Sequence, residues 1–176
     1  MNIPPEAIEL LKELKENGIT AYIAGGALRD WHMGNEPKDL DIWFFKDVDD
    51  SYPPALGGEK PKRYMALQGY TGALGISSIY KGNFKGYDYD QIQYNSAGIH
   101  ECVAGFDCPV NMAFMDYTGK VTKTPEFLDA HSTKTAVIKI NRPHDTYYRT
   151  LVRKDRLTNR LPGYTVSIEG EIDLGG

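Results

Sequence analysis

Apolar residues recur at helical spacing near the start of the chain. Residues 6–17 follow Pro4 and Pro5 and carry Ala7, Leu10, Leu11 and Leu14 at helical spacing. This spacing places the four side chains on one face of a helix, and proline is well tolerated in a first helical turn. The pattern predicts a helix whose apolar face belongs to the core.

A different pattern follows, in which short apolar runs alternate with turn residues. Residues 20–25 (TAYIAG) predict a strand that ends at a Gly-Gly pair, and residues 27–34 (ALRDWHMG) predict a helix. Residues 40–45 (LDIWFF) predict a second strand, in which alternation directs Leu40 and Ile42 toward the core. The chain therefore opens with helix, strand, turn, helix and strand.

The remaining sequence predicts further strands and one long amphipathic helix. The predicted elements are a loop over 46–62, a helix then a strand over 63–82, a strand over 87–95, a helix or strand closed by a turn over 110–121, a strand over 136–140, a helix over 146–161, and a strand or tail over 162–176. We expect the α/β (α+β) class, with one domain over 1–176.

Composition narrows the functional classes. The 176 residues are enough to bury a core without stabilising disulfides or metal ions. The net charge of -4 gives no general attraction to nucleic acid, so contact with nucleic acid needs a local basic patch. Cys102 and Cys108 fit neither a disulfide framework nor a zinc motif and indicate buried thiols in a reducing compartment. With neither signal-peptide features nor a membrane-length apolar run, we expect a cytoplasmic protein with no membrane partner.

Two aspartates adjoin the second predicted strand. Asp39 and Asp41 are two positions apart and therefore project from the same face, where like charges repel unless a cation lies between them. Carboxylate oxygens suit Mg²⁺, and two such ions can activate an attacking oxygen and stabilise a leaving one. An Asp-x-Asp pair is also common on solvated strand faces, so the pair alone does not establish a metal site.

The Gly-Gly pair adds a second candidate feature. Gly25 and Gly26 allow close backbone approach to a ligand, and the following helix start offers free N–H groups to an anion. Arg29, in the first turn, can reach a phosphate with its planar guanidinium, and Asp30 can brace Arg29. The alternative is a tight turn with a surface Arg-Asp pair.

Together these motifs resemble a known family. The segments GGALRD and KDLDIW resemble the head domain of the CCA-adding enzyme and bacterial poly(A) polymerase class, within the polymerase-β-like nucleotidyltransferase superfamily. The segment DCPVNMAFMDYTGKV is a weaker match, and LVRKDRL is similar to an arginine-bearing helix of that class. Gly105 and Phe106 stand where the family has an arginine pair, and the chain ends where family members continue into helical domains that hold tRNA.

The resemblance implies a head domain with a small mixed sheet flanked by helices. It also implies a Mg²⁺-dependent enzyme that moves NMP from an NTP to a hydroxyl acceptor, with an RNA 3′ end favoured, and releases pyrophosphate. It implies two Mg²⁺ ions, replaceable by Mn²⁺, and a third carboxylate for which we prefer Asp90 to Asp88. The implied catalytic and metal-binding residues are Asp39, Asp41 and Asp90. The implied nucleotide-binding residues are Gly25, Gly26, Arg29, Asp30, Lys38, Asp107, Asn111, Arg153 and Arg156.

Several alternatives stay open at this stage. Arg149, Arg153 and Arg156 share one helical face and predict either a basic wall for triphosphate or nucleic acid, or a solvated face paired with Asp145 and Asp155. The acceptor can instead be a protein or a small molecule, as for a toxin-like transferase. A non-catalytic domain that binds nucleotide or a partner is the third possibility, and a partner subunit can supply RNA-binding domains.

Overall fold

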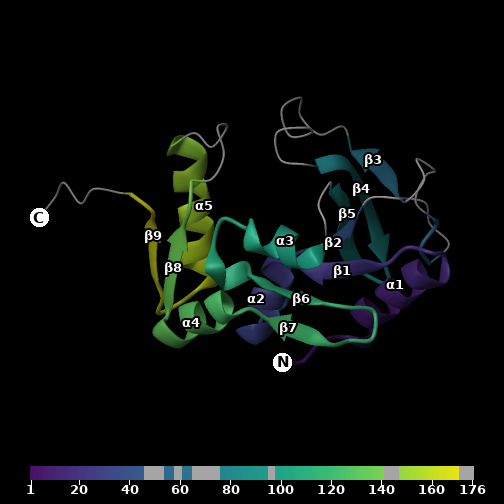
Figure 1. Cartoon of the computed structure of the whole chain (residues 1–176), viewed down its shortest axis with the longest axis horizontal. Helices are drawn as coiled ribbons and strands as arrows, with labels where there is room; N and C mark the ends of the chain where they lie inside the picture. The colour runs from purple at the N-terminus through teal and green to yellow at the C-terminus, as the bar shows by residue number, and fades with distance from the viewer. Residues whose placement is uncertain (46–53, 58–60, 65–75, 95–97, 141–146, 171–176) are drawn as a thin grey trace, which may run out of the picture.

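The computed structural model describes residues 1–45, 54–57, 61–64, 76–94, 98–140 and 147–170 (Figure 1). It contains a mixed sheet, a set of short helices and a smaller unit beside the sheet, so the predicted class and the mixed sheet flanked by helices are confirmed. In the described part of the chain, no helix is both long and apolar enough to cross a membrane.

The main sheet has seven strands in the order β3-β4-β5-β2-β1-β6-β7. Their bounds are β1 Ala21–Ala24, β2 Leu40–Phe45, β3 Lys62–Tyr64, β4 Ile76–Phe84, β5 Tyr87–Tyr94, β6 Ala113–Met115 and β7 Val121–Lys123. All neighbouring strands are antiparallel except β2 and β5, which run parallel at the centre of the sheet. The register of this one parallel pair decides which residues of β2 and β5 lie opposite each other in the candidate site.

Helices pack against both sides of this sheet. The leucines of α1 (Pro5–Glu16) are fully buried in the main hydrophobic cluster, as the helical spacing predicts. In the view of Figure 1, α2 (Gly26–His32) lies behind β6, and α3 (Ile99–Ala104) lies in front of β1. Strand β2 alternates as predicted, with Leu40 and Ile42 fully buried.

A second, smaller core lies beside the sheet. It is formed by the 3-10 helix η1 (Pro109–Asn111), α4 (Pro125–Thr133), β8 (Thr135–Ile138), α5 (Tyr147–Arg160) and β9 (Thr165–Ile168). Its buried apolar members are Cys108, Val110, Ala130, Ala136, Ile138, Leu157 and Leu161. Strands β8 and β9 pair in parallel and lie next to α5 at one end of the molecule (Figure 1).

Both cysteines are buried free thiols, as predicted. Cys102 belongs to α3, and burial raises its pKa to about 12. Cys108 belongs to the smaller core, and burial likewise raises its pKa. Neither thiol is therefore a nucleophile in the folded protein.

Two short helices were not predicted from the pattern. Helix α4 begins with a cap in which the Phe127 N–H donates to Thr124 Oγ1 at 3.1 Å, and Pro125 follows the cap. A threonine and a proline at these positions are recognisable start signals, but few apolar residues repeat behind them. Helix α3 has only six residues, too few for a periodic pattern to stand out.

The structure describes some of the remaining predicted elements and leaves others outside its described residues. Residues 110–121, predicted as helix or strand, form the end of η1 and the β6–β7 hairpin. The strand expected within 63–82 is β4, whereas 65–75, which include the helix predicted there, lie outside the described residues, as do 46–53, 58–60 and 171–176. The C-terminal strand is confirmed as β9.

His131 joins α4 to two other parts of the smaller core. Its Nε2 lies 3.0 Å from the Val110 carbonyl oxygen, and its Nδ1 lies 2.7 Å from the Tyr164 hydroxyl. A carbonyl can only accept, so Nε2–H donates to Val110, while Nδ1 shares a hydrogen bond with the Tyr164 hydroxyl, which also donates to Met33 Sδ at 3.4 Å. The ring also packs against His32 with 4.4 Å between centroids, and burial lowers the pKa of His131 to about 4.

We expect this histidine to make the fold sensitive to acid. Because the unfolded side chain titrates near its ordinary value of 6.5, the unfolded state binds the proton first as the pH falls. The free energy of unfolding should then decrease from about pH 7 to about pH 4, by up to about 3 kcal/mol. Urea denaturation at several pH values should show this slope, and a flatter slope in His131→Gln. Parallel slopes in the two proteins would assign the effect elsewhere.

Candidate active site

The Gly-Gly turn connects the end of β1 to the start of α2. Gly25 has a φ of 94°, a conformation that favours glycine, and its N–H donates to the Ala113 carbonyl at 3.3 Å. The Gly25 carbonyl accepts from the N–H groups of Leu28 and Arg29. The Gly25 N–H is therefore already used within the fold, and Gly26 begins the set of helix-start N–H groups that have no helical acceptor.

Arg29 is fixed above this turn. Its Nε donates to Asp30 Oδ1 at 3.1 Å and its Nη1 donates to Asn111 Oδ1 at 3.1 Å. The Arg29 side chain is only 11% exposed, and its Nη2 lies 3.3 Å from the position that a Cβ at Gly26 would occupy. The guanidinium is thus held close to the first turn of α2, where an anion would meet it.

Asp30 and Asn111 lie beneath Arg29 and are buried. Asp30 braces Arg29, as predicted, and its other carboxylate oxygen lies 3.6 Å from Nη1 of Arg160 on α5. Both side chains were predicted to bind nucleotide. Their placement gives them an indirect route to a ligand, through the orientation of Arg29.

Gly26 offers a test of this arrangement. In Gly26→Ala the added methyl group would press on the Arg29 guanidinium and displace it. We expect the KM for NTP to rise about tenfold with little change in folding, because small displacements of binding groups have large effects on rate. Gly105→Ala is the control, since its Cβ would meet only ordinary contacts at 3.5 Å or more. Steady-state kinetics compares the two, and equal KM values would contradict the role of Arg29.

Three carboxylates meet on the neighbouring strands. Asp41 on β2 is directly in register with Asp90 on β5, and Asp39 precedes β2 on the same face. Burial, then the charges of Asp39 and Asp90, raise the pKa of Asp41 to about 7. Burial and Asp90 also raise the pKa of Asp39. The carboxylates are crowded enough that a cation between them would stabilise the group.

Asp90 and Asp88 have different surroundings. Asp90 Oδ1 lies 3.0 Å from Nζ of Lys81, its register partner on β4, whereas Asp88 accepts from Asn83 Nδ2 at 2.9 Å in the hairpin turn. The register therefore favours Asp90, not Asp88, as the carboxylate that faces Asp41.

The donor set fits a metal shared with substrate. Among the residues that the structure describes, no three His, Cys, Asp or Glu side chains form a ready group for a metal ion. Mg²⁺ commonly uses only one or two protein carboxylates and completes its shell with water and substrate phosphates. Asp39 and Asp41 meet that requirement, and burial together with the neighbouring carboxylates raises the pKa of both.

Basic residues approach the carboxylates from other elements. Arg153 on α5 forms an ion pair with Asp107, and its charge lowers the pKa of Asp41. Lys38 is exposed, and its charge lowers the pKa of the adjacent Asp39. Arg156 is exposed on the same helix as Arg153. The structure joins Arg153 to Asp107. The sequence left open whether the arginines of this helix form a basic wall or pair with Asp145 and Asp155, and Asp145 lies outside the described residues.

Sequence reasoning missed two residues of this network, Lys81 and Arg160. Lys81 reaches Asp90 between two strands whose register was unknown from the sequence. Arg160 reaches Asp30 across a large separation in sequence. The signal for Lys81 is the β4–β5 hairpin itself, since once its turn is placed at Lys85–Gly86, Lys81 falls opposite Asp90. No comparable local signal identifies Arg160.

Comparison with known proteins supports the resemblance noted in the sequence. No family model matches the chain. A curated relative, the CC-adding tRNA nucleotidyltransferase of Halalkalibacterium halodurans, is 46% identical over 83 residues, which are 46% of this chain and 22% of the relative. The stretch that aligns is therefore less than a quarter of that protein.

Solved structures match over nearly the whole chain. The Bacillus stearothermophilus CCA-adding enzyme in complex with CTP has a TM-score of 0.57 and 19% identity, and the match covers 94% of this chain and 41% of that one. The Thermotoga maritima CCA-adding enzyme complexed with tRNA has a TM-score of 0.60 and 14% identity, and the match covers 95% of this chain and 40% of that one. The chain has the fold of the head region of these enzymes and spans less than half their length.

Proposed function

We propose that this chain is a nucleotidyltransferase that moves a nucleoside monophosphate from an NTP to the 3′-hydroxyl of an RNA and releases pyrophosphate. The observation that carries the proposal is the juxtaposition of the Gly25-Gly26 turn, with Arg29 fixed above it, and the Asp39–Asp41 pair on the adjoining strand. A phosphate site and a carboxylate pair at this spacing suit a triphosphate whose α-phosphate lies by the carboxylates.

The residues divide into two roles around the triphosphate. The N–H groups of Gly26 and Ala27 at the helix start and the Arg29 guanidinium bind the β- and γ-phosphates, which become the leaving pyrophosphate. Gly25 gives the turn its shape, because its own N–H is bonded to Ala113. Lys38 neutralises further charge beside Asp39.

Asp39 and Asp41 would hold Mg²⁺, or Mn²⁺ in its place. When bound, the metal supplies charge neutralisation at the reacting phosphate and lowers the pKa of the attacking hydroxyl. Asp90 lies across from Asp41 and orients the acceptor hydroxyl, while Lys81 limits the negative charge that Asp90 adds. Positioning and electrostatics of this kind account for most of the acceleration in phosphoryl-type transfer.

The base and the acceptor use other parts of the chain. Arg153 and Arg156 lie on α5, where Arg153 is anchored by Asp107, and we assign them to the nucleotide. Asn111 and Asp30 act by holding Arg29. The choice of RNA is supported by the names of the relatives, a tRNA nucleotidyltransferase and a CCA-adding enzyme complexed with tRNA.

The proposal is tested by label transfer. The protein is incubated with each α-³²P-labelled NTP, Mg²⁺ and total cellular RNA and protein, and products are resolved before and after RNase or protease treatment. RNase-sensitive label that depends on Mg²⁺ is the expected result and identifies the nucleotide. Protease-sensitive label would move the acceptor to protein, and nucleotide binding without any transfer would make the chain a non-catalytic binding domain.

A further inference from the structure

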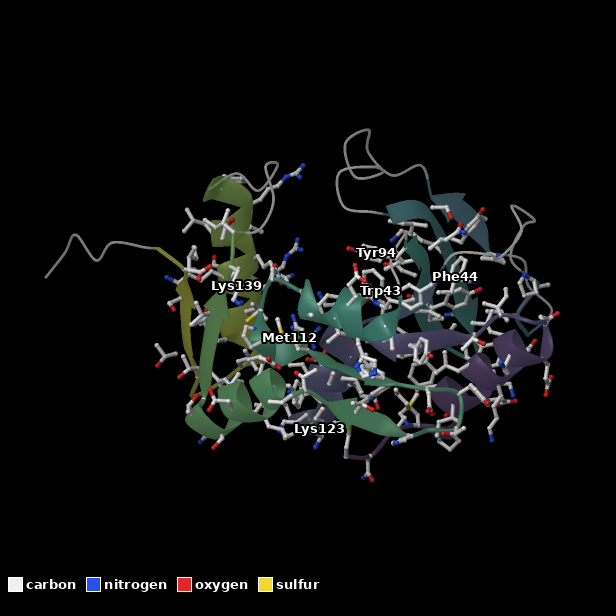
Figure 2. All side chains as sticks on the ribbon, viewed as in Figure 1. Trp43, Phe44, Tyr94, Met112, Lys123 and Lys139 are labelled. Atoms are coloured by element: carbon white, nitrogen blue, oxygen red, sulfur yellow. The ribbon has the colours of Figure 1, made fainter. Side chains whose placement is uncertain are left out.

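Next to the carboxylates, the same face of the sheet carries a group of aromatic rings. Trp43 follows Asp41 by two positions on β2, and Tyr94 follows Asp90 on the parallel strand β5. The Trp43 ring lies 5.7 Å from that of Tyr94 and 5.5 Å from that of Phe106, measured between centroids. Figure 2 shows Trp43 and Tyr94 beside each other. We call Trp43, Tyr94 and Phe106 the aromatic shelf.

The shelf is not fully absorbed into the core. Trp43 and Phe106 pack against the main hydrophobic cluster, yet both remain partly accessible, as does Tyr94. Among the described residues, the indole Nε1 of Trp43 has no hydrogen-bond partner, although buried tryptophan N–H groups usually have one. The Nε1 atom is itself buried, so the part of the shelf that a ligand can reach is the partly accessible ring surface, which is suited to stack against a planar group.

The position of the shelf indicates which ligand this is. Strands β1 and β2 are antiparallel, with Ile23 opposite Ile42 and Tyr22 opposite Trp43. Moving along β2 from Asp41 to Trp43 therefore leads away from the Gly25-Gly26 turn, by about 7 Å for two strand residues. Trp43, and Tyr94 opposite Phe45, therefore lie on the other side of Asp41 from the turn, whereas Phe106 bridges the two ends.

In-line displacement also requires the leaving phosphates of the NTP and the acceptor hydroxyl to lie on opposite sides of the site. The attacking oxygen and the leaving phosphate lie on opposite sides of the reacting phosphorus. With the leaving phosphates at the Gly25-Gly26 turn, the acceptor hydroxyl enters from the Trp43 side. Phe106 closes this side toward the turn, since its ring lies 3.7 Å from the Cβ position of Gly25.

We propose that the aromatic shelf, with Trp43 at its centre, stacks the terminal base of a single-stranded RNA acceptor and so places its 3′-hydroxyl beside Asp41 and Asp90. The inference rests on the proposed function and extends it to a specific binding surface. Stacking on aromatic rings tolerates any base, because every base has a π face. The shelf therefore selects a single-stranded nucleic-acid end over a protein hydroxyl, while the identity of the added nucleotide is decided elsewhere.

Fluorescence provides a direct test with the full chain. The protein has two tryptophans, and Trp31 is buried at 4% exposure, so quenching by a ligand reports on Trp43. The probes are a pentacytidylate RNA and an abasic pentamer of equal charge, both at one fixed salt concentration because phosphate contacts depend on salt. We expect the RNA to quench the emission and to bind about tenfold to a hundredfold more tightly than the abasic strand.

A matched pair of variants separates stacking from packing. Trp43→Phe keeps an aromatic face, and Trp43→Leu keeps apolar bulk without one. Because neither variant retains the fluorescent reporter, calorimetric titration measures the RNA affinity of both variants and of the wild type. We expect Trp43→Phe to bind the RNA and Trp43→Leu to fall to the affinity of the abasic strand. Circular dichroism melts verify that both variants fold. Equal RNA affinity in Trp43→Leu and the wild type, or equal affinity of the wild type for both strands, would overturn the inference.

The failure of the inference can be told apart from failure of the proposed function. If label transfer to RNA proceeds while RNA binding is indifferent to Trp43, the enzyme assignment stands and the shelf has only a packing role. If the RNA stacks on Trp43 but no nucleotide is transferred, the shelf stands as a binding surface and the assignment as a transferase falls.

Discussion

Asp41→Asn should reduce nucleotidyl transfer at least about a thousandfold while leaving the fold intact. Asparagine keeps the shape of the side chain but removes the charge that the metal requires. Asp41 is the partly buried carboxylate between Asp39 and Asp90, with a pKa raised to about 7 by burial and by those two charges. Initial rates of label transfer at saturating NTP measure the loss.

The same substitution should stabilise the metal-free protein. The raised pKa means that the folded state disfavours the charged form of Asp41, so at pH 8 the neutral amide should increase the free energy of unfolding by a few kcal/mol at most. Asp88→Asn is the matched control, because Asp88 lies on β5 near Asp90 but is exposed and bonded to Asn83. Wild-type rates in Asp41→Asn, or an equal loss in Asp88→Asn, would rule out the assignment of the carboxylates.

Asp30→Ala should destabilise the protein by about 3–5 kcal/mol, the effect of removing one partner of a buried ion pair. The side chain of Asp30 is 4% exposed, and its loss would leave the guanidinium of Arg29 buried without a counter-charge. Arg29 would also lose its orientation above Gly26, so NTP binding should weaken in the variant that remains folded. Urea denaturation and nucleotide titration measure the two effects separately.

Arg160→Ala serves as the comparison. Arg160 lies farther from Asp30, at 3.6 Å, and is 28% exposed, so its removal should change the free energy of unfolding by about 1 kcal/mol or less. Asp30→Asn should give an intermediate loss, since it keeps a hydrogen-bond acceptor for Arg29 without the charge. A change below about 1 kcal/mol in Asp30→Ala would mean that the buried pair contributes little.

The central part of the site was predictable because its geometry is local. The strand, the Gly-Gly turn and the helix of residues 21–32 follow one another directly, and alternation alone places Asp39 and Asp41 on the face opposite Leu40. The α/β class followed from the same periodic patterns, whereas the small mixed sheet was implied by the resemblance to the nucleotidyltransferase head domain.

The rest depended on contacts that no local pattern encodes. Asn111 reaches Arg29 from 82 residues away and Arg153 reaches Asp107 from 46 residues away, so their roles appear only when the smaller core docks beside α2. The pairing of Lys81 with Asp90 required the register of the β4–β5 hairpin. Helices α3 and α4 were missed because tertiary packing, not a long apolar repeat, stabilises them.

Each part of the molecule contains one buried thiol, whose alkylation rate reports how often that part opens. Cys102 lies on the buried face of α3, which packs against the main sheet, and Cys108 lies within the smaller core. A thiol buried in this way reacts with an alkylating reagent only during a transient opening. Mass spectrometry can follow the alkylation of each cysteine, and the rate measures how often the surrounding part of the fold opens. Unequal alkylation rates would mean that the smaller core, which holds Arg153, opens independently of the sheet that bears the carboxylates. Equal rates would mean that the two parts open together.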